Sequence, residues 1–262
     1  MKRIVYLFFV VLYYYPLIAQ DSTQVNYKLG SARIQILNTC FGPSDTLVSF
    51  INVHENERTS VDAAEEFLMN YGGNLMVLKH SGNRYITFYL RKKKYFIDPN
   101  RIYTKKGIAA TLKRLSHYNA EAAKEVERFS THLLKHFVDG KNLVIALHNN
   151  TDLNYSINSY LNGGEEAINA AMVHINEEMD EDDFIVTTDS TLFDRIKDLN
   201  INVVLQDNIR AVDDGSLSVY AAKKNIPYIN IEAQEGHREE QLAMMQALQE
   251  IIKEYAMIKP GD

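Results

Sequence analysis

The side chains best suited to metal chemistry in this chain stand directly after apolar, strand-like segments. His54 and Glu57, separated by two residues, follow the apolar segment 47–53, and His148 follows a second apolar segment, 142–147. A tight turn with the His-x-x-Glu spacing can direct an imidazole and a carboxylate toward one point. His148 could then supply a third ligand from another strand. Three protein ligands with nitrogen and oxygen donors leave one open position, as in catalytic zinc sites.

A further carboxylate, Glu232, closes the strand-like segment 228–232. Zinc lowers the pKa of a bound water to about 7 and polarises a carbonyl group. A free carboxylate nearby can act as the general base, and Glu232 is the candidate for that role. Ligands of open α/β sheets bind beyond the carboxyl ends of the strands. The shared position of these residues therefore favours a metal-dependent catalytic site.

The alternative interpretation is that these residues are incidental. With 8 histidines and ordinary glutamate usage, about half a His-x-x-Glu match is expected by chance. A histidine after a strand is most often a packed or surface residue. Only the coincidence of three such positions at strand ends favours a site.

This pattern resembles the zinc carboxypeptidase superfamily, which includes metallocarboxypeptidases and the succinylglutamate desuccinylase/aspartoacylase group. The superfamily binds zinc through His-x-x-Glu after one strand and a distant His after another, and His54, Glu57 and His148 match in type and order. The resemblance implies one zinc ion per chain, held by these three residues. It also implies that Glu232 is the catalytic carboxylate, because a short helix and a proline-containing turn precede it, as in the family.

The family also carries an Asn-Arg pair that holds the carboxylate of the substrate, often within Asp-x-Asn-Arg. Residues 98–101 are Asp-Pro-Asn-Arg, so the resemblance implies substrate binding by Asn100 and Arg101. Arginine is the planar, bidentate partner for a carboxylate. The simpler alternative is that the pair caps a helix start or that Arg101 pairs with Asp98.

The chain also departs from the family pattern. Glycines that usually surround His-x-x-Glu are missing, and segment 207–214 has no tyrosine, although it contains Arg210. The second arginine of the family, which assists the oxyanion, has three possible matches in this chain: Arg84, Arg91 and Lys93. The substrate class is therefore less well defined by the motifs than the metal site.

The elements that must position these residues alternate along the chain. Buried strands are predicted at 47–53, 74–79, 142–147, 184–188, 203–206 and 228–232, with a hairpin over 84–90 and 95–98. Helices are predicted at 61–71 (with Thr59 or Ser60 as N-cap), 119–138, 165–177, 216–224 and 238–255. Segment 149–164, rich in Asn, Ser and Gly, is predicted to be a functional loop. Apolar strands between helices indicate a single α/β domain with a mixed, mainly parallel sheet flanked by helices. The resemblance implies the zinc carboxypeptidase-like (phosphorylase/hydrolase-like) version of that fold.

The first 19 residues have the layout of a secretory signal peptide. Lys2 and Arg3 precede an apolar run that ends at Ala19, and this run of about 16 residues is shorter than the ~20 needed to span a bilayer. The alternative is a permanent anchor. Cleavage near Ala19 would leave residues 20–262 as the catalytic domain, with no stable membrane span, in the periplasm or secreted.

Composition excludes several classes of protein. At 46% hydrophobic and 24% charged residues, the chain has the composition of a folded globular domain rather than of a disordered tail. Without Lys2 and Arg3, its 28 basic residues fall to 26 against 34 acidic ones, a formal net charge of −8. Such a chain is a poor candidate for binding nucleic acid. Its one cysteine, Cys40, cannot form an internal disulfide.

The expected function is that of an exported zinc metallohydrolase of the metallocarboxypeptidase or amidohydrolase type. It would cleave an amide or peptide bond next to a free carboxylate, on a peptidoglycan-derived or other short peptide. One alternative is an N-acyl amino acid deacylase of the desuccinylase/aspartoacylase type, with a small pocket lidded by 149–164. A second alternative is a non-catalytic ligand-binding module on the same fold.

Overall fold

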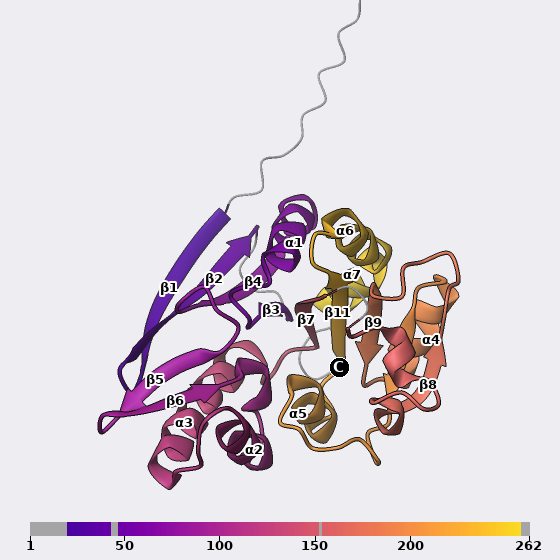
Figure 1. Ribbon diagram of the computed structural model, residues 1–262. Helices are drawn as coiled ribbons and strands as arrows, with labels where there is room; N and C mark the ends of the chain where they lie inside the picture. The colour runs from indigo at the N-terminus through magenta and orange to yellow at the C-terminus, as the bar shows by residue number, and fades with distance from the viewer. Residues whose placement is uncertain (1–19, 43–46, 152–153, 258–262) are drawn as a thin grey trace, which may run out of the picture.

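A computed structural model describes residues 20–42, 47–151 and 154–257. The predicted signal peptide, residues 1–19, lies outside the described residues. Nine strands of the described segments form one mixed sheet in the order β1-β2-β4-β3-β7-β11-β9-β10-β8 (Figure 1). Strands β1, β4, β3, β7, β11 and β8 run one way, and β2, β9 and β10 run the other. The predicted α/β architecture with a mixed, mainly parallel sheet is confirmed.

The strands of the sheet have these bounds: β1 Gln20–Leu29, β2 Ala32–Phe41, β3 Val48–Asn52, β4 Gly73–Lys79, β7 Leu143–Asn150, β8 Ala170–His174, β9 Phe184–Thr187, β10 Val203–Gln206 and β11 Tyr228–Gln234. The predicted hairpin is also present, as β5 Ile86–Leu90 and β6 Lys93–Ile97. The helices are α1 Arg58–Tyr71, α2 Lys105–Leu115, α3 Ala120–Phe137, α4 Ser190–Asp198, α5 Leu217–Lys224, α6 Arg238–Ala247 and α7 Gln249–Met257.

Helices cover both faces of the sheet, and this explains the continuous apolar run over residues 143–147 of β7. In β7, Leu143, Ile145 and Leu147 pack in one core cluster with α1, α4, α6 and α7. The alternate residues, Val144 and Ala146, pack in a second cluster with α2, α3, α5 and the β5–β6 hairpin. Successive side chains of a strand point to opposite faces, so a strand buried on both faces carries apolar residues at every position.

The helix predicted over 165–177 is wrong. Its first part is the short 3-10 helix Ala167–Asn169, and β8 follows as an edge strand antiparallel to β10. Glutamate and alanine favour a helix, but pairing with β10 decides the conformation of this segment.

Other boundaries also differ from the prediction. Helix α1 begins at Arg58 with Glu57 at its N-cap position, instead of Thr59 or Ser60. The predicted closing helix is divided at Leu248 into α6 and α7. Strands β1 and β2 and helices α2 and α4 were not predicted. In the described part of the chain, no helix combines the length and apolar character needed to cross a bilayer.

Candidate metal centre and its cavity

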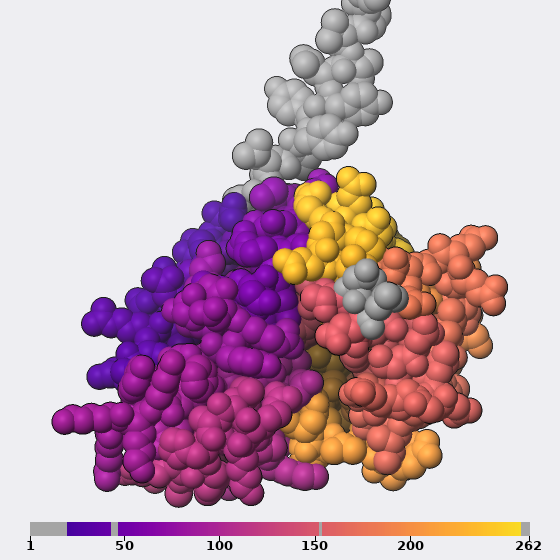
Figure 2. Space-filling model, viewed as in Figure 1, coloured from indigo at the N-terminus to yellow at the C-terminus, as the bar shows by residue number. Residues whose placement is uncertain are grey.

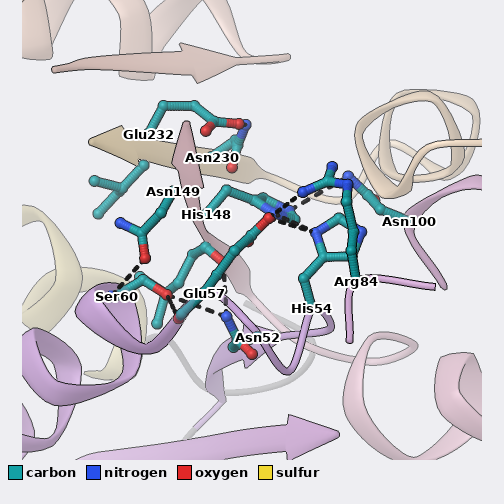
Figure 3. Close-up of polar contacts among 12 residues, drawn as sticks. Asn52, His54, Glu57, Ser60, Arg84, Asn100, His148, Asn149, Asn230 and Glu232 are labelled. Atoms are coloured by element: carbon teal, nitrogen blue, oxygen red, sulfur yellow. Dashed lines mark hydrogen bonds and ion pairs between the residues drawn. The ribbon is translucent and has the colours of Figure 1, made fainter. Parts of the chain in front are cut away.

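Three predicted ligands converge in the structure. His54 lies in the turn after β3, Glu57 precedes α1, and His148 lies within β7, which extends three residues beyond its predicted end. The Nδ1 atom of His54 is 2.8 Å from Glu57 Oε1, and the Nδ1 atom of His148 is 2.9 Å from Glu57 Oε2. The two Nδ1 atoms are 3.2 Å apart (Figure 3). All three side chains are buried, and one ligand atom from each lies within 4.8 Å of the others.

The donor set of this group fits a zinc ion. It offers two imidazole nitrogens and a carboxylate, the N and O donors of catalytic zinc sites. The second ring nitrogen of each histidine, Nε2, contacts a further polar side chain. His54 Nε2 lies 2.9 Å from Asp98 Oδ1, and His148 Nε2 lies 3.3 Å from Asn100 Nδ2. Metal-binding histidines are typically oriented by such contacts of the other ring nitrogen.

Electrostatics within the group are dominated by the pairing of carboxylates with imidazoles. Burial disfavours the protonated form of His54, but Glu57 and Asp98 outweigh burial and raise its pKa. Burial alone would raise the pKa values of Glu57 and Asp98. The two histidines reverse this effect for Glu57, and His54 reverses it for Asp98, so both pKa values fall well below their usual range. Both carboxylates are therefore ionised at neutral pH.

Of the three cations that the motifs left open, the structure brings Arg84 to this group. Its Nη1 atom contacts Glu57 Oε1, and its side chain lines the adjoining cavity (Figure 3). Arg91 is exposed and pairs with Glu121, and Lys93 is exposed in β6. Of the three, Arg84 is thus the one that contacts a candidate metal ligand.

Glu232 is buried next to the metal ligands. It lies in β11 in register with His148 of β7, and its Oε1 accepts a hydrogen bond of 2.9 Å from Asn230 Nδ2. Burial raises the pKa of Glu232, and the neighbouring His148 opposes that shift only in part. Burial thus favours the protonated form of this carboxyl group more than in an exposed glutamate.

Asn100 and Arg101 lie in the short 3-10 helix Pro99–Arg101. Asp98 caps this helix by accepting from Asn100 N. Arg101 pairs with Asp214 instead of Asp98, with 3.1 Å between Nε and Oδ2, and its Nη1 donates to Asn100 O. Burial alone would lower the pKa of Arg101, but Asp214 together with Asp98 and other nearby acidic groups outweighs burial and raises it.

The metal centre opens into a cavity of about 540 Å³. The face shown in Figure 2 is hollowed at its centre, between the magenta and coral parts of the chain. This cavity is lined by residues from the N-terminal half, from the part of the chain after β7 and from the region around β11. Among them are Arg84, Asn100, Arg101, Tyr155, Tyr160, Glu166, Asp214 and Glu232. The cavity therefore joins every predicted site residue except the fully buried His54.

Tyr155, Tyr160, Glu166 and Asp214 were not predicted as site residues. The two tyrosine hydroxyls contact each other, and burial raises the pKa of both side chains, so they are neutral at physiological pH. The one signal for the tyrosines was the polar composition of 149–164, which was predicted to be a functional loop. No motif pointed to Glu166 or Asp214.

A buried hydrogen-bond network fixes the backbone behind the ligands. Asn149 accepts from Ser60 N at 2.9 Å and donates to Gln241 Oε1 at 3.1 Å. Gln241, fully buried in α6, donates to His148 O at 3.0 Å. Asn52 donates to Ser60 Oγ at 3.1 Å, and Ser60 Oγ donates to Glu57 O at 2.9 Å (Figure 3). The network thus joins the backbones of Glu57 and His148.

Comparison with solved structures finds similar folds. The chain is 11% identical to the product-bound ectoine utilization protein EutE (DoeB) from Ruegeria pomeroyi, over 95% of this chain and 71% of that one, with a TM-score of 0.48. It is 12% identical to a metallo-carboxypeptidase from Burkholderia cenocepacia, over 89% and 65% of the two chains, with a TM-score of 0.47. It is 9% identical to a succinylglutamate desuccinylase/aspartoacylase from Rhodobacter sphaeroides, over 90% of this chain and 69% of that one, with a TM-score of 0.46.

The second and third of these structures bear the names of groups within the superfamily that the sequence motifs resemble. No protein-family model matches the chain, and a search of curated proteins finds no match. At these identities the likeness concerns the fold, so the chemistry of the site follows from its own geometry.

Proposed function

We propose that this protein is a zinc-dependent hydrolase that cleaves an amide or peptide bond next to a free carboxylate. One observation carries the proposal. The buried His54–Glu57–His148 group, the buried carboxyl group of Glu232 and the guanidinium of Arg101 all lie at one cavity of about 540 Å³. A cavity of this volume is within the range of small-molecule sites and holds a short peptide end.

Each residue has a defined task in this proposal. Arg101 and Asn100 bind the terminal carboxylate and so place the scissile carbonyl group at the metal centre. A bound zinc ion supplies Lewis-acid polarisation and lowers the pKa of water. Glu232 accepts the proton of the attacking water and then donates it to the leaving amine. Arg84 places a positive charge where the carbonyl oxygen becomes negative.

The first experiment measures the zinc content of the protein lacking residues 1–19, by elemental analysis. We expect about one zinc per chain, and loss of zinc in His54→Ala and in His148→Ala. The exposed His136 of α3 provides the matched control, His136→Ala, which keeps its zinc. Circular dichroism establishes that each variant folds. A wild-type protein that takes up no zinc even after reconstitution contradicts the proposal.

The second experiment tests catalysis separately from metal binding. Glu232→Gln keeps the size and hydrogen-bonding capacity of the side chain but cannot accept the proton. We expect this variant to bind zinc normally and to hydrolyse short peptides at least about 100-fold more slowly than wild type, the usual scale of general-base loss. Equal rates would remove Glu232 from the mechanism.

A second candidate function is an N-acyl amino acid deacylase. The observation that favours it is the contribution of Asn149, Asn150, Tyr155 and Tyr160 to the cavity wall, because a deacylase of this type would use segment 149–164 to cover its pocket. A panel of short peptides and N-acyl amino acids, compared at equal concentration, separates the two activities.

We also propose that the protein is exported, which makes a cell-envelope peptide its substrate. Support comes from residues 1–19, whose charged start and apolar run have the layout of a signal peptide. Mass spectrometry of the protein recovered from an exporting bacterial host is expected to find an N-terminus close to Gln20. Recovery of the intact chain would contradict cleavage.

A further inference from the structure

The guanidinium that would bind the substrate carboxylate shares its end of the cavity with two carboxylates, Asp214 and Glu166. From this arrangement we infer the substrate class, on the premise of the proposed hydrolase. We propose that the residue released from the substrate has a cationic side chain, with its carboxylate on Arg101 and its ammonium group on Glu166. Lysine is the simplest amino acid with this chemistry.

Asp214 acts as the fixed partner of Arg101. Its Oδ1 accepts from Ser216 N at 2.9 Å, and its Oδ2 lies 3.1 Å from Arg101 Nε. Arg101 Nη1 also donates to Asn100 O at 2.8 Å. Both contacts orient the guanidinium and leave its other N–H groups for a ligand. Since Asp214 already neutralises Arg101, this pair alone offers no surplus positive charge to an anionic substrate.

Glu166 supplies the surplus negative charge. It is half-buried in the cavity wall, and its Oε2 accepts from Asn169 Nδ2. Asn169 is itself fixed, because its Oδ1 accepts from Val212 N at 2.9 Å and its backbone oxygen accepts from Asp207 N at 2.8 Å. Within residues 20–42, 47–151 and 154–257, the Oε1 atom of Glu166 has no hydrogen-bond partner. A positioned carboxylate with a free oxygen is a suitable acceptor for an ammonium group.

The wall beside Glu166 suits an alkyl chain. Tyr155 and Tyr160 line the cavity, and both rings pack against Phe184, with centroid distances of 5.4 and 6.1 Å. Burial is the main cause of the raised pKa of both tyrosines, and Asp214 is the main group that raises the pKa of Arg101; the charge of Glu166 adds to all three shifts, so Glu166 lies within electrostatic reach of these groups. Long cationic side chains typically lay their methylene groups on such surfaces while the charged end reaches a polar group.

The same arrangement disfavours acidic substrates. A released aspartate or glutamate would bring a second carboxylate to a subsite where Glu166 and Asp214 face a single guanidinium. Like charges that share one partly buried site repel each other more strongly than in water. The proposed subsite therefore differs in substrate specificity from a site that binds N-acyl derivatives of acidic amino acids.

The test measures binding of free amino acids to the zinc-loaded protein by isothermal titration calorimetry. Lysine and norleucine form a matched pair, since they differ only in the terminal ammonium group. We expect lysine to bind about tenfold or more tightly than norleucine, as for a charged hydrogen bond, and glutamate to bind more weakly than either. Equal affinities for lysine and norleucine, or preferred binding of glutamate, would overturn the inference.

Two neighbouring glutamates provide the matched variants. Glu166→Gln is expected to remove the preference for lysine over norleucine while zinc content and norleucine affinity stay as in wild type. Glu165→Gln makes the same charge change one residue earlier, at an exposed position outside the cavity wall, and is expected to keep the preference. A lysine preference that survives in Glu166→Gln overturns the assignment of Glu166.

Hydrolysis of peptides ending in lysine or norleucine distinguishes this inference from the proposed function. Turnover of both peptides at equal efficiency would overturn the cationic subsite and leave the hydrolase intact. A lysine preference in binding without hydrolysis of any peptide would overturn the hydrolase and leave the subsite intact.

Discussion

The carboxylate of Asp98 connects the proposed substrate-binding segment to the candidate metal centre. Its Oδ1 lies 2.9 Å from His54 Nε2 and also accepts from Asn100 N at 3.0 Å. One buried side chain therefore orients a predicted metal ligand and caps the short helix that carries Asn100 and Arg101. Such carboxylate–histidine contacts fix the tautomer of the ligand and strengthen its bond to the metal.

Replacement of Asp98 is expected to weaken zinc binding. Asp98→Asn keeps the shape of the side chain but removes the charge that favours a proton on His54 Nε2. We expect zinc affinity to fall about 10- to 100-fold in a competition titration with a chelator. The control is Asp198→Asn, an exposed position at the end of α4. Unchanged affinity in Asp98→Asn would contradict the positioning role.

At this scale, the sequence identified residues at strand ends better than residues in loops. His54, Glu57 and His148 converge as predicted, because each follows or closes a strand of the same sheet edge. Tyr155, Glu166 and Asp214 lie in irregular segments whose course no periodicity indicates. Arg84 could be named only as one of three cations, since the path of the chain before β5 decides which one reaches Glu57.

At the scale of the elements, α6 holds the backbone of a ligand strand. Gln241 of α6 donates to His148 O at 3.0 Å and accepts from Asn149 at 3.1 Å. Asn149 in turn accepts from the backbone of Ser60 in α1. A polar residue on the buried side of a helix is thus explained by the strand that it supports, and helical periodicity alone could not predict it.

Loss of Gln241 is expected to destabilise the fold. In Gln241→Met the carbonyl group of His148 and the amide of Asn149 each lose a buried partner, which costs about 2–3 kcal/mol in the free energy of unfolding. Urea denaturation measures this loss. Gln246→Met, at an exposed position of the same helix, is the matched control and is expected to change stability by less than about 0.5 kcal/mol. Equal stability of the two variants would contradict a supporting role for α6.

Among the strands, those of the central sheet were predicted from runs of buried apolar residues. The apolar residues of segments 203–206 and 228–232 are buried because both faces of the sheet are covered there. The predicted helix over 165–177 failed because it forms an edge strand instead, where one partner strand outweighs the preference of glutamate and alanine for helix. The predicted closing helix is divided at Leu248, where the sequence has no proline or glycine. Its apolar periodicity therefore could not indicate that the helix is divided.

At the scale of the whole molecule, the site depends on a junction between two distant segments. Residues 100–107 carry the proposed substrate-binding pair, and residues 213–216 precede α5. Tyr103 N donates to Gly215 O at 2.9 Å. Gly107 and Gly215 pack so closely that a Cβ atom on Gly107 would lie 2.2 Å from the Cα atom of Gly215. The two glycines therefore let the segments meet and bring Arg101 to Asp214.

Asp213 adds a charged contact to this junction. It accepts from Thr104 Oγ1 at 2.6 Å and from Lys223 Nζ at 2.5 Å. Partial burial alone would raise the pKa of Asp213, but Lys223 and Thr104 outweigh it and lower the pKa. A carboxyl group with a lowered pKa in the folded state stabilises the protein above its unfolded pKa of about 3.9. This contribution disappears as the pH falls toward the folded pKa.

Asp213→Asn is therefore expected to destabilise the protein in a pH-dependent way. Near pH 7 the variant loses the ionised contacts with Thr104 and Lys223, and the free energy of unfolding falls by about 1–2 kcal/mol. Below about pH 4 Asp213 takes up a proton in the unfolded wild-type protein, whereas in the folded protein it stays ionised until the pH nears its lowered pKa, so the difference between the two proteins shrinks. Urea denaturation from pH 7 to pH 3.5 measures this trend. Asp194→Asn, an exposed position on α4, is the control. A difference that stays constant with pH would show that the loss comes from packing, since only a titrating carboxylate can make the junction weaken as the pH falls.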